Sequence, residues 1–164
     1  VAGLTFDPAL PPFVCESGLS VCIMHAQGPP QTMQDDPRYD HVLLDVYDWL
    51  EKRVAALAAA GIPRDRIVID PGIGFGKTQA HNLALLQGVA LFHGLGCPVL
   101  LGASRKGFIG RVAAVPYADR RAPGSIAVAL AAASQGVQIF RVHDVAETAQ
   151  AFALWRAVSQ GEIS

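Results

Sequence analysis

The chain alternates four times between a short apolar segment and a longer amphipathic one. The short segments are rich in Val, Ile and Leu, as in strands that are buried on both faces of a sheet. They cover residues 21–25, 66–70, 98–102 and 137–142. The longer segments predict helices over residues 40–60, 82–95, 124–135 and 145–159, with shorter helical turns at 13–17 and 108–114. Repeated strand–helix units predict an α/β fold with a parallel sheet and right-handed crossovers.

The number of strands conflicts with the architecture that such repeats usually build. A (β/α)8 barrel needs eight strands in roughly 250 residues, whereas this chain has 164 residues. A four-stranded doubly wound sheet is the alternative. Glycines 72, 74 and 76 give G-x-G-x-G, which is not the dinucleotide-binding G-x-G-x-x-G. The segment also lacks the glycine spacing of a phosphate-binding P-loop, so the sequence favours neither nucleotide motif.

Composition narrows the class of protein. The chain is 51% hydrophobic and 16% charged, with a net charge of −1, which indicates a globular domain and no nucleic-acid or membrane-surface partner. Its three cysteines include no C-x-x-C pair, which argues against a disulfide framework or a zinc site and favours a reducing compartment. No signal peptide or membrane-length apolar run is evident. We therefore expect a cytoplasmic protein.

Polar side chains follow all four predicted strands. They are His25 and Gln27, then Asp70, then Ser104, Arg105 and Lys106, and then Arg141 and His143. Because the carboxyl ends of parallel strands meet at one end of the fold, we expect these groups to converge on one ligand site.

The chemistry of these groups predicts the kind of ligand. Asp70, when ionised, accepts hydrogen bonds and suits a ligand with paired N–H donors. Lys106 can donate to a carbonyl or ring nitrogen, and Arg141 can stack on a flat ring or hold a phosphate. His143 is a second donor to an anion. The set predicts a pocket for a flat heterocycle that carries a phosphate.

Each side chain also has a structural interpretation. Asp70 could cap the following turn or form a buried salt bridge with Lys106, and His143 could be a core histidine. Met24 fits a core position as well as a ligand pocket. A triad of Ser104, His143 and Asp70 is conceivable, but no G-x-S-x-G elbow accompanies it. The other histidines lack metal-ligand spacing with acids or cysteines, so no metal site is predicted.

Five motifs stand in order along the chain at or near these strand ends. They are M-H-A-Q-G at 24–28, P-Q-T-M-Q at 30–34, D-P-G-I-G-F-G-K at 70–77, G-A-S-R-K at 102–106 and R-V-H-D at 141–144. Together they resemble the motifs of the dihydropteroate synthases of the folate pathway. The resemblance implies a TIM-barrel transferase that joins 6-hydroxymethyl-7,8-dihydropterin diphosphate to p-aminobenzoate. It also implies assistance by Mg²⁺, a homodimer formed through the barrel helices, and sensitivity to sulfonamides.

The resemblance assigns roles to the catalytic and anchoring residues. Asp70 would hold the amino-pyrimidine edge of the pterin, and Lys106 would bond its oxygen and ring nitrogen. Arg141 would pack on the ring and, with His143, hold the diphosphate. Lys106, Arg141 and His143 are therefore the residues expected to carry the chemistry.

The remaining expected site residues line the two substrate pockets. The resemblance implies that Met24 and Gly102 line the pterin pocket, and that Phe75, Ser104 and Arg105 lie near p-aminobenzoate.

The resemblance begins partway through the family's barrel. Residues 1–4 look like the segment just after the tip of the fourth strand, so the chain is expected to be the C-terminal half of a single pterin-binding barrel domain over 1–164, with about four strands. The family's metal ligand would belong to the missing half, and little activity is expected from this chain alone. The alternatives are a non-catalytic pterin-binding half-barrel, the methyltetrahydrofolate-binding domain of corrinoid methyltransferases, and a structural half-barrel that dimerises.

Overall fold

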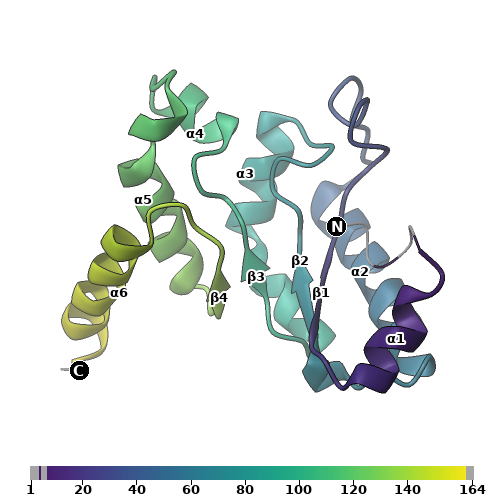
Figure 1. The fold of residues 1–164 in the computed structure, drawn as a ribbon. Coiled ribbons are helices and arrows are strands. Elements are labelled where there is room, and N and C mark those ends of the chain that lie inside the picture. Colours follow the sequence, from purple (N-terminus) through teal and green to yellow (C-terminus); the bar gives the residue numbers. More distant parts are fainter. Residues whose placement is uncertain (1–3, 5–6, 162–164) are drawn as a thin grey trace.

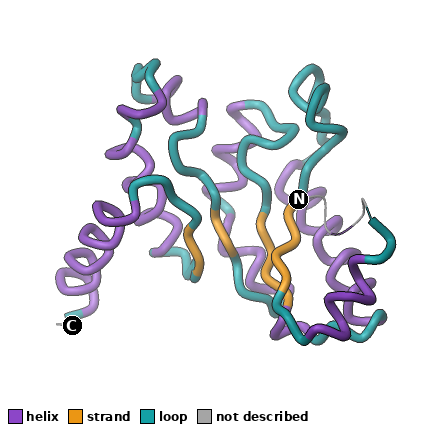
Figure 2. The backbone as a smooth tube through the Cα atoms, viewed as in Figure 1, coloured by secondary structure: helices purple, strands orange, loops and turns teal. Residues whose placement is uncertain are grey.

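The computed structural model describes Leu4 and residues 7–161, the side chain of Gln160 excepted. Residues 1–3, which the sequence placed just after a preceding strand, lie outside the described part. Four short strands stand side by side in Figures 1 and 2, and they are β1 (Val21–Met24), β2 (Ile67–Asp70), β3 (Leu100–Leu101) and β4 (Ile139–Phe140).

Every described strand pairing is parallel, as the sequence predicted. β1 pairs with β2 in the register that sets Met24 opposite Asp70, and β3 pairs with β4. An isolated bridge between Ile69 and Val99 links the two pairs. Backbone hydrogen bonds extend beyond the named strands, since Arg141 N donates to Leu101 O at 3.0 Å. The four strands therefore lie in the order β1-β2-β3-β4, with like ends together.

One helix precedes β1, and helices follow each strand. They are α1 (Leu10–Ser17), α2 (Val42–Ala59), α3 (Gln79–Gln87), α4 (Gly107–Val112), α5 (Ala122–Ala133) and α6 (Val145–Gln160), with 3₁₀ turns η2 (Arg64–Arg66), η3 (Val89–Leu95) and η4 (Ala118–Arg120). Figure 1 shows α2 at the β1 end of the strands and α5 and α6 at the β4 end. None of the described helices combines the length and apolarity needed to cross a membrane.

The predicted helix over residues 82–95 is wrong at both its start and its continuity. α3 begins at Gln79 because the Thr78 hydroxyl accepts from His81 N and the His81 ring accepts from Thr78 N, which forms a capping box. The helix stops before Gly88, where an added Cβ would lie 2.5 Å from Leu43 Cδ2 of α2. Glycine there leaves room for the Leu43 side chain of α2, and the chain continues as η3.

The hydrophobic core lies between the first three strands and the helices α2, α3 and η3. α2 presents apolar residues at steps of three and four to this core, as its pattern predicted. The side chains that are 0% exposed include Ile23, Ile69 and Val99 of the strand region, Val46 and Leu50 of α2, Leu85 of α3 and Phe92 of η3. The β4 side is more open, with Ile139 37% exposed.

Candidate functional site

Three of the predicted ligand groups, Asp70, Lys106 and Arg141, lie close together at the carboxyl ends of the strands, whereas the Gln27 amide pairs with the Arg38 backbone. Asp70, at the end of β2, is 1% exposed. Its Oδ1 accepts from Gly72 N at 2.8 Å, and its Oδ2 lies 3.4 Å from Arg141 Nη2. Burial raises the pKa of Asp70, while the Gly72 N–H and the charges of Arg141, Lys106 and Lys77 oppose that rise in pKa. Met24, opposite Asp70 on β1, is 3% exposed and belongs to the floor of this region.

The glycine loop, residues 70–77, turns sharply because β1 comes very close to it. Gly72 has φ +72°, and a Cβ built there would lie 1.8 Å from the carbonyl oxygen of His25. No side chain fits at that distance, so residue 72 must be glycine.

Three side chains from elsewhere in the chain, and Lys77 of the loop itself, hold this loop by its backbone. Four consecutive loop carbonyls each accept a hydrogen bond from a different donor. The pairs are Ile73 O with Lys106 Nζ, Gly74 O with Gln34 Nε2 (2.6 Å), Phe75 O with Lys77 Nζ (2.9 Å) and Gly76 O with the Tyr39 hydroxyl (2.8 Å). The loop is therefore ordered by specific donors, which fixes the groups at its rim.

Lys106 does not form the salt bridge with Asp70 that was one interpretation of the sequence. Its Nζ donates to Ile73 O and lies 4.0 Å from the centroid of the Phe75 ring. Burial lowers the pKa of Lys106 to about 8, with Asp70 acting to raise the pKa and Arg141 to lower it. The ammonium group thus lies over an aromatic face and within the electrostatic influence of the Asp70 carboxylate.

Arg141 extends from the end of β4 across β3. Its guanidinium lies where a side chain at Gly102 would be, since a Cβ on Gly102 would be 2.8 Å from Arg141 Nη2. The Arg141 side chain is 58% exposed, so much of its planar cation remains accessible to a ligand. Gly102 therefore belongs to the site because it makes room for Arg141.

The loops after β3 and β4 are joined by two polar contacts. Ser104 Oγ accepts from His143 N at 3.2 Å and lies 3.0 Å from His143 Nδ1. Arg105, with φ +58°, directs its guanidinium to the Asp144 carboxylate, with Nε 3.0 Å from Oδ2. The hydrogen bond from Arg105 lowers the pKa of Asp144. These contacts fix His143 and place the Arg105 side chain against Asp144.

The spacing of Asp144 and Glu147 predicts that Asp144 caps the helix over 145–159, and that prediction is wrong. Asp144 makes no side-chain cap to α6, because its carboxylate is engaged by Arg105. A Ser104–His143–Asp70 triad does not form, because the Asp70 carboxylate is bonded to Gly72 N and Arg141.

Sequence reasoning missed the donors that order the glycine loop. Lys77 is 3% exposed and His25 is 5% exposed, and Lys77 Nζ lies 2.9 Å from His25 Nδ1. Burial, with the charge of Lys77, lowers the pKa of His25 to about 3. Neither Lys77 nor Gln34 and Tyr39 carried a sequence signal for this role, because lysine and loop side chains are ordinarily exposed.

The described residues do not form a metal site. Across Leu4 and residues 7–161, no group of three or more His, Cys, Asp or Glu side chains could hold a metal ion. The donor set at the strand ends is mainly cationic around Asp70, which suits an anionic ligand and does not suit Mg²⁺.

These features define a parallel β/α protein with a ligand site at the carboxyl ends of its strands. A family model described as "Pterin binding enzyme" matches residues 1–143, and the chain belongs to that family. The family suggested by the motifs is thereby confirmed.

Its relatives include dihydropteroate synthases. The chain is 44% identical over 145 residues to the dihydropteroate synthase of Escherichia coli (strain K12), covering 88% of this chain and 51% of the relative. It resembles the structure of the Yersinia pestis enzyme with a sulfonamide drug complex, at 40% identity and TM-score 0.91, covering 98% of this chain and 57% of that one. The Xanthomonas albilineans enzyme in complex with 7,8-dihydropteroate gives 39% identity and TM-score 0.88, covering 96% of this chain and 57% of that one. The chain spans about half the length of the curated relatives it matches.

Proposed function

We propose that the chain is part of a dihydropteroate synthase, a transferase of folate biosynthesis. The reaction joins 6-hydroxymethyl-7,8-dihydropterin diphosphate to p-aminobenzoate and yields 7,8-dihydropteroate and diphosphate. The observation that carries the proposal is the buried Asp70 carboxylate with Lys106 and Arg141 beside it at the strand ends. Similarity to enzymes whose structures hold 7,8-dihydropteroate and a sulfonamide drug supports it.

The site residues take roles that match their positions. Asp70 accepts hydrogen bonds from the amino-pyrimidine edge, because a buried carboxylate needs paired donors. Lys106 donates to the pterin oxygen and ring nitrogen from its place over Phe75. Arg141 packs on the pterin ring above Gly102 and, with His143, holds the diphosphate. Met24 lines the pterin pocket.

The p-aminobenzoate side is formed by Phe75, Ser104 and Arg105. Ser104 acts there through its contact with His143, and Arg105 acts by tying the two loops together at Asp144. Phe75 offers an aromatic face to the second substrate.

The chemistry needs no covalent nucleophile from the protein. The bond between the pterin methylene carbon and the diphosphate oxygen breaks, and the electron-rich pterin delocalises the positive charge. Arg141 and His143 stabilise the departing anion. The amine nitrogen of p-aminobenzoate then forms the new C–N bond and loses a proton to solvent.

Magnesium is part of this proposal only as an ion held outside the described residues. The described side chains do not fit it. The ion would neutralise diphosphate charge when bound.

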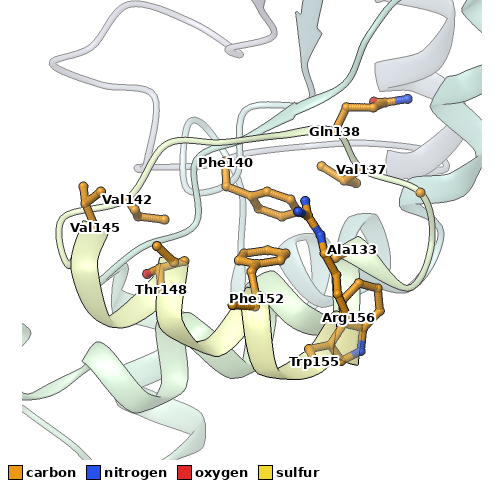
Figure 3. A pocket seen from close by; sticks show the side chains of 13 residues that line it. Ala133, Val137, Gln138, Phe140, Val142, Val145, Thr148, Phe152, Trp155 and Arg156 are labelled. Carbon is orange, nitrogen blue, oxygen red and sulfur yellow. The ribbon is translucent and has the colours of Figure 1, made fainter. Parts of the chain in front are cut away.

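We propose further that residues 1–164, with their four strands, form half of a (β/α)8 barrel. The rest of a longer polypeptide would supply the other half and close the barrel. The chain's match to about half of its relatives supports this. So does an apolar groove of about 1170 Å³ beside β4 and α6, where Phe140, Phe152 and Trp155 gather (Figure 3). An open edge of this kind needs a covering segment. We expect little synthase turnover from the 164-residue chain without that segment.

A cytoplasmic homodimer is the assembly we propose. The outer face of α6 exposes Leu154 (66%) and Val158 (80%), apolar residues that suit a helix–helix contact between copies. The apolar groove itself would be covered within one barrel, so the two surfaces have different partners.

Calorimetry with a dihydropterin tests the site assignment. Asp70→Ala and Lys106→Ala should abolish binding, whereas Lys52→Ala, on the exposed face of α2, should leave it unchanged. Unchanged binding in the first two variants would contradict the assignment. Binding that survives with no turnover, even after the missing half-barrel is added, would instead favour a pterin-binding module without catalysis. Binding of methyltetrahydrofolate in preference to the pterin would favour the methyltransferase-domain alternative.

A further inference from the structure

A buried pair of basic side chains lies beneath the glycine loop and has no role in the chemistry above. Lys77 Nζ lies 2.9 Å from His25 Nδ1 and donates to Phe75 O, also at 2.9 Å. The two side chains are 3% and 5% exposed. Lys77 therefore connects the end of β1 to the middle of the loop without reaching solvent.

His25 is a fixed anchor for this connection. Its backbone N–H donates to Asp70 O at 3.0 Å, so its main chain continues the pairing of β1 with β2. Its ring packs edge-on against Trp49 of α2, with 5.1 Å between ring centroids and 86° between planes. Because both backbone and ring are held, a group bonded to His25 Nδ1 takes its position from the strand.

The pair keeps its hydrogen bond in either protonation state of Lys77. Burial, opposed by Asp70 and assisted by the charge of Lys106, lowers the pKa of Lys77 to about 7. The Tyr39 ring also faces Lys77, with its centroid 6.0 Å from Nζ. Charged Lys77 donates to the neutral His25 ring, and neutral Lys77 can accept from the other ring tautomer. The bond to Phe75 O needs only one remaining N–H.

Asp70 and Phe75 share one support, Gly72, whose N–H donates to the Asp70 carboxylate and whose carbonyl accepts from Phe75 N at 3.1 Å, but their other supports differ. The Asp70 carboxylate is held by Gly72 N and Arg141. Phe75 is held at its carbonyl by Lys77, and its ring lies under Lys106. A change at Lys77 should therefore move Phe75 more than Asp70.

We propose that Lys77 is a positioning residue, which sets the place of the Phe75 ring by joining His25 to the Phe75 carbonyl and thereby tunes the p-aminobenzoate side of the site. The assignment of Phe75 to that side rests on the proposed function. The geometry that links Lys77 to the Phe75 ring is independent of the proposed function.

The first test needs no ligand. The lysines of the chain are Lys52, Lys77 and Lys106, so their ε-methylene NMR signals can be assigned by substitution. The ring current of Phe75 should displace the Lys106 signal, because Nζ lies 4.0 Å from the ring centroid. Lys77→Met keeps the side-chain volume and should remove most of that displacement, whereas Lys52→Met should not. An unchanged Lys106 signal in folded Lys77→Met overturns the proposal.

A second readout uses the wild-type chain, in case Lys77→Met does not fold. The nitrogen shifts of His25 should change as Lys77 titrates near pH 7, far above the pKa of about 3 of His25 itself. His25 nitrogens that stay constant from pH 5.5 to 8.5 overturn the link.

The third test separates the two substrates. In Lys77→Met, calorimetry should show pterin affinity within about twofold of wild type, while p-aminobenzoate, titrated with pterin present, binds about tenfold more weakly, a change of about 1.4 kcal/mol. Equal losses for both ligands, or none for either, contradict the positioning role. A wild-type chain that binds no pterin contradicts the proposed function instead, and the NMR signals still decide the role of Lys77.

Discussion

Replacing Gly72 by alanine should destabilise the protein far more than replacing a glycine of similar backbone conformation elsewhere. Gly72 has φ +72° and Gly96 has φ +67°, so both substitutions place alanine in the left-handed region. That conformation costs about 1–2 kcal/mol for a residue with a Cβ. At Gly96 nothing lies within 4 Å of the added Cβ, so Gly96→Ala should carry only this conformational cost.

At Gly72 the added Cβ also meets the backbone. It would lie 1.8 Å from His25 O, whereas a carbon and a carbonyl oxygen rest no closer than roughly 3.3 Å. The end of β1 must therefore move away from the glycine loop by roughly 1.5 Å. That movement breaks the hydrogen bond from His25 N to Asp70 O and strains the contact of His25 with Lys77. Losing one or two buried hydrogen bonds costs about 1–3 kcal/mol each, so Gly72→Ala should cost about 2–8 kcal/mol in total.

Urea unfolding of the two variants measures the difference. The free energy of unfolding of Gly72→Ala should fall at least about 1 kcal/mol below that of Gly96→Ala, with the m-value unchanged. Equal destabilisation within about 0.5 kcal/mol would refute the reasoning, because it would show that β1 and the loop are not in contact at this point.

Three further predictions concern caps, charges and loop ties. Thr78→Ala should cost about 1 kcal/mol of stability in urea unfolding, because it removes the side-chain cap of α3; a cost near zero would contradict that role. The pKa of Lys77 is about 7 when the protein is folded and 10.5 when it is unfolded. Between pH 7 and pH 10.5 the unfolded chain therefore binds more protons than the folded one. The free energy of unfolding should rise with pH over this range, by up to about 5 kcal/mol. Lys77→Met should remove that part of the rise in thermal unfolding measured from pH 7 to 10, and a profile identical to wild type would contradict the assignment. Arg105→Ala should weaken the binding of inorganic diphosphate several-fold in calorimetry, because it releases the loop that holds His143. Asp144→Ala should weaken it to the same extent. Opposite effects of the two substitutions would mean that Arg105 contacts the anion directly.

The sequence located all four strands because their signal is local, but it made two of them too long: 98–102 was predicted where β3 covers Leu100–Leu101, and 137–142 where β4 covers Ile139–Phe140. Ile67–Ile69 is apolar and β-branched, and the following Pro and Gly end the strand, so β2 was predicted within one residue of its observed start. α2 was predicted equally well from its apolar face and its Gly61 end. The break between α3 and η3 was missed, because it depends on Leu43 of α2 packing at Gly88, a contact over 45 residues away in sequence.

The candidate site was likewise predictable only in part. Which residues stand at the strand ends follows from strand periodicity, and Asp70, Lys106 and Arg141 were all named on that basis. Which groups pair there does not follow, because an acid has several cations within reach and geometry alone chooses among them. Lys106 turns to Ile73 O, leaving Arg141 beside Asp70. Likewise, the Asp144 carboxylate accepts a hydrogen bond from Arg105 and does not cap its own helix.

The glycine loop shows why these choices matter for function. A loop with three glycines at alternate positions has little conformational preference of its own, yet it must present Asp70 and Phe75 in fixed positions. Four donors on its consecutive carbonyls supply the missing rigidity, and Lys106 and Lys77 are two of them. Both lysines have lowered pKa values, near 8 and 7. The same two side chains therefore supply positive charge near the site and hydrogen bonds that shape the loop. Ligand affinity should therefore depend on pH between about 7 and 8 through the charge of the two lysines, because the Lys77 bonds that shape the loop persist in either protonation state.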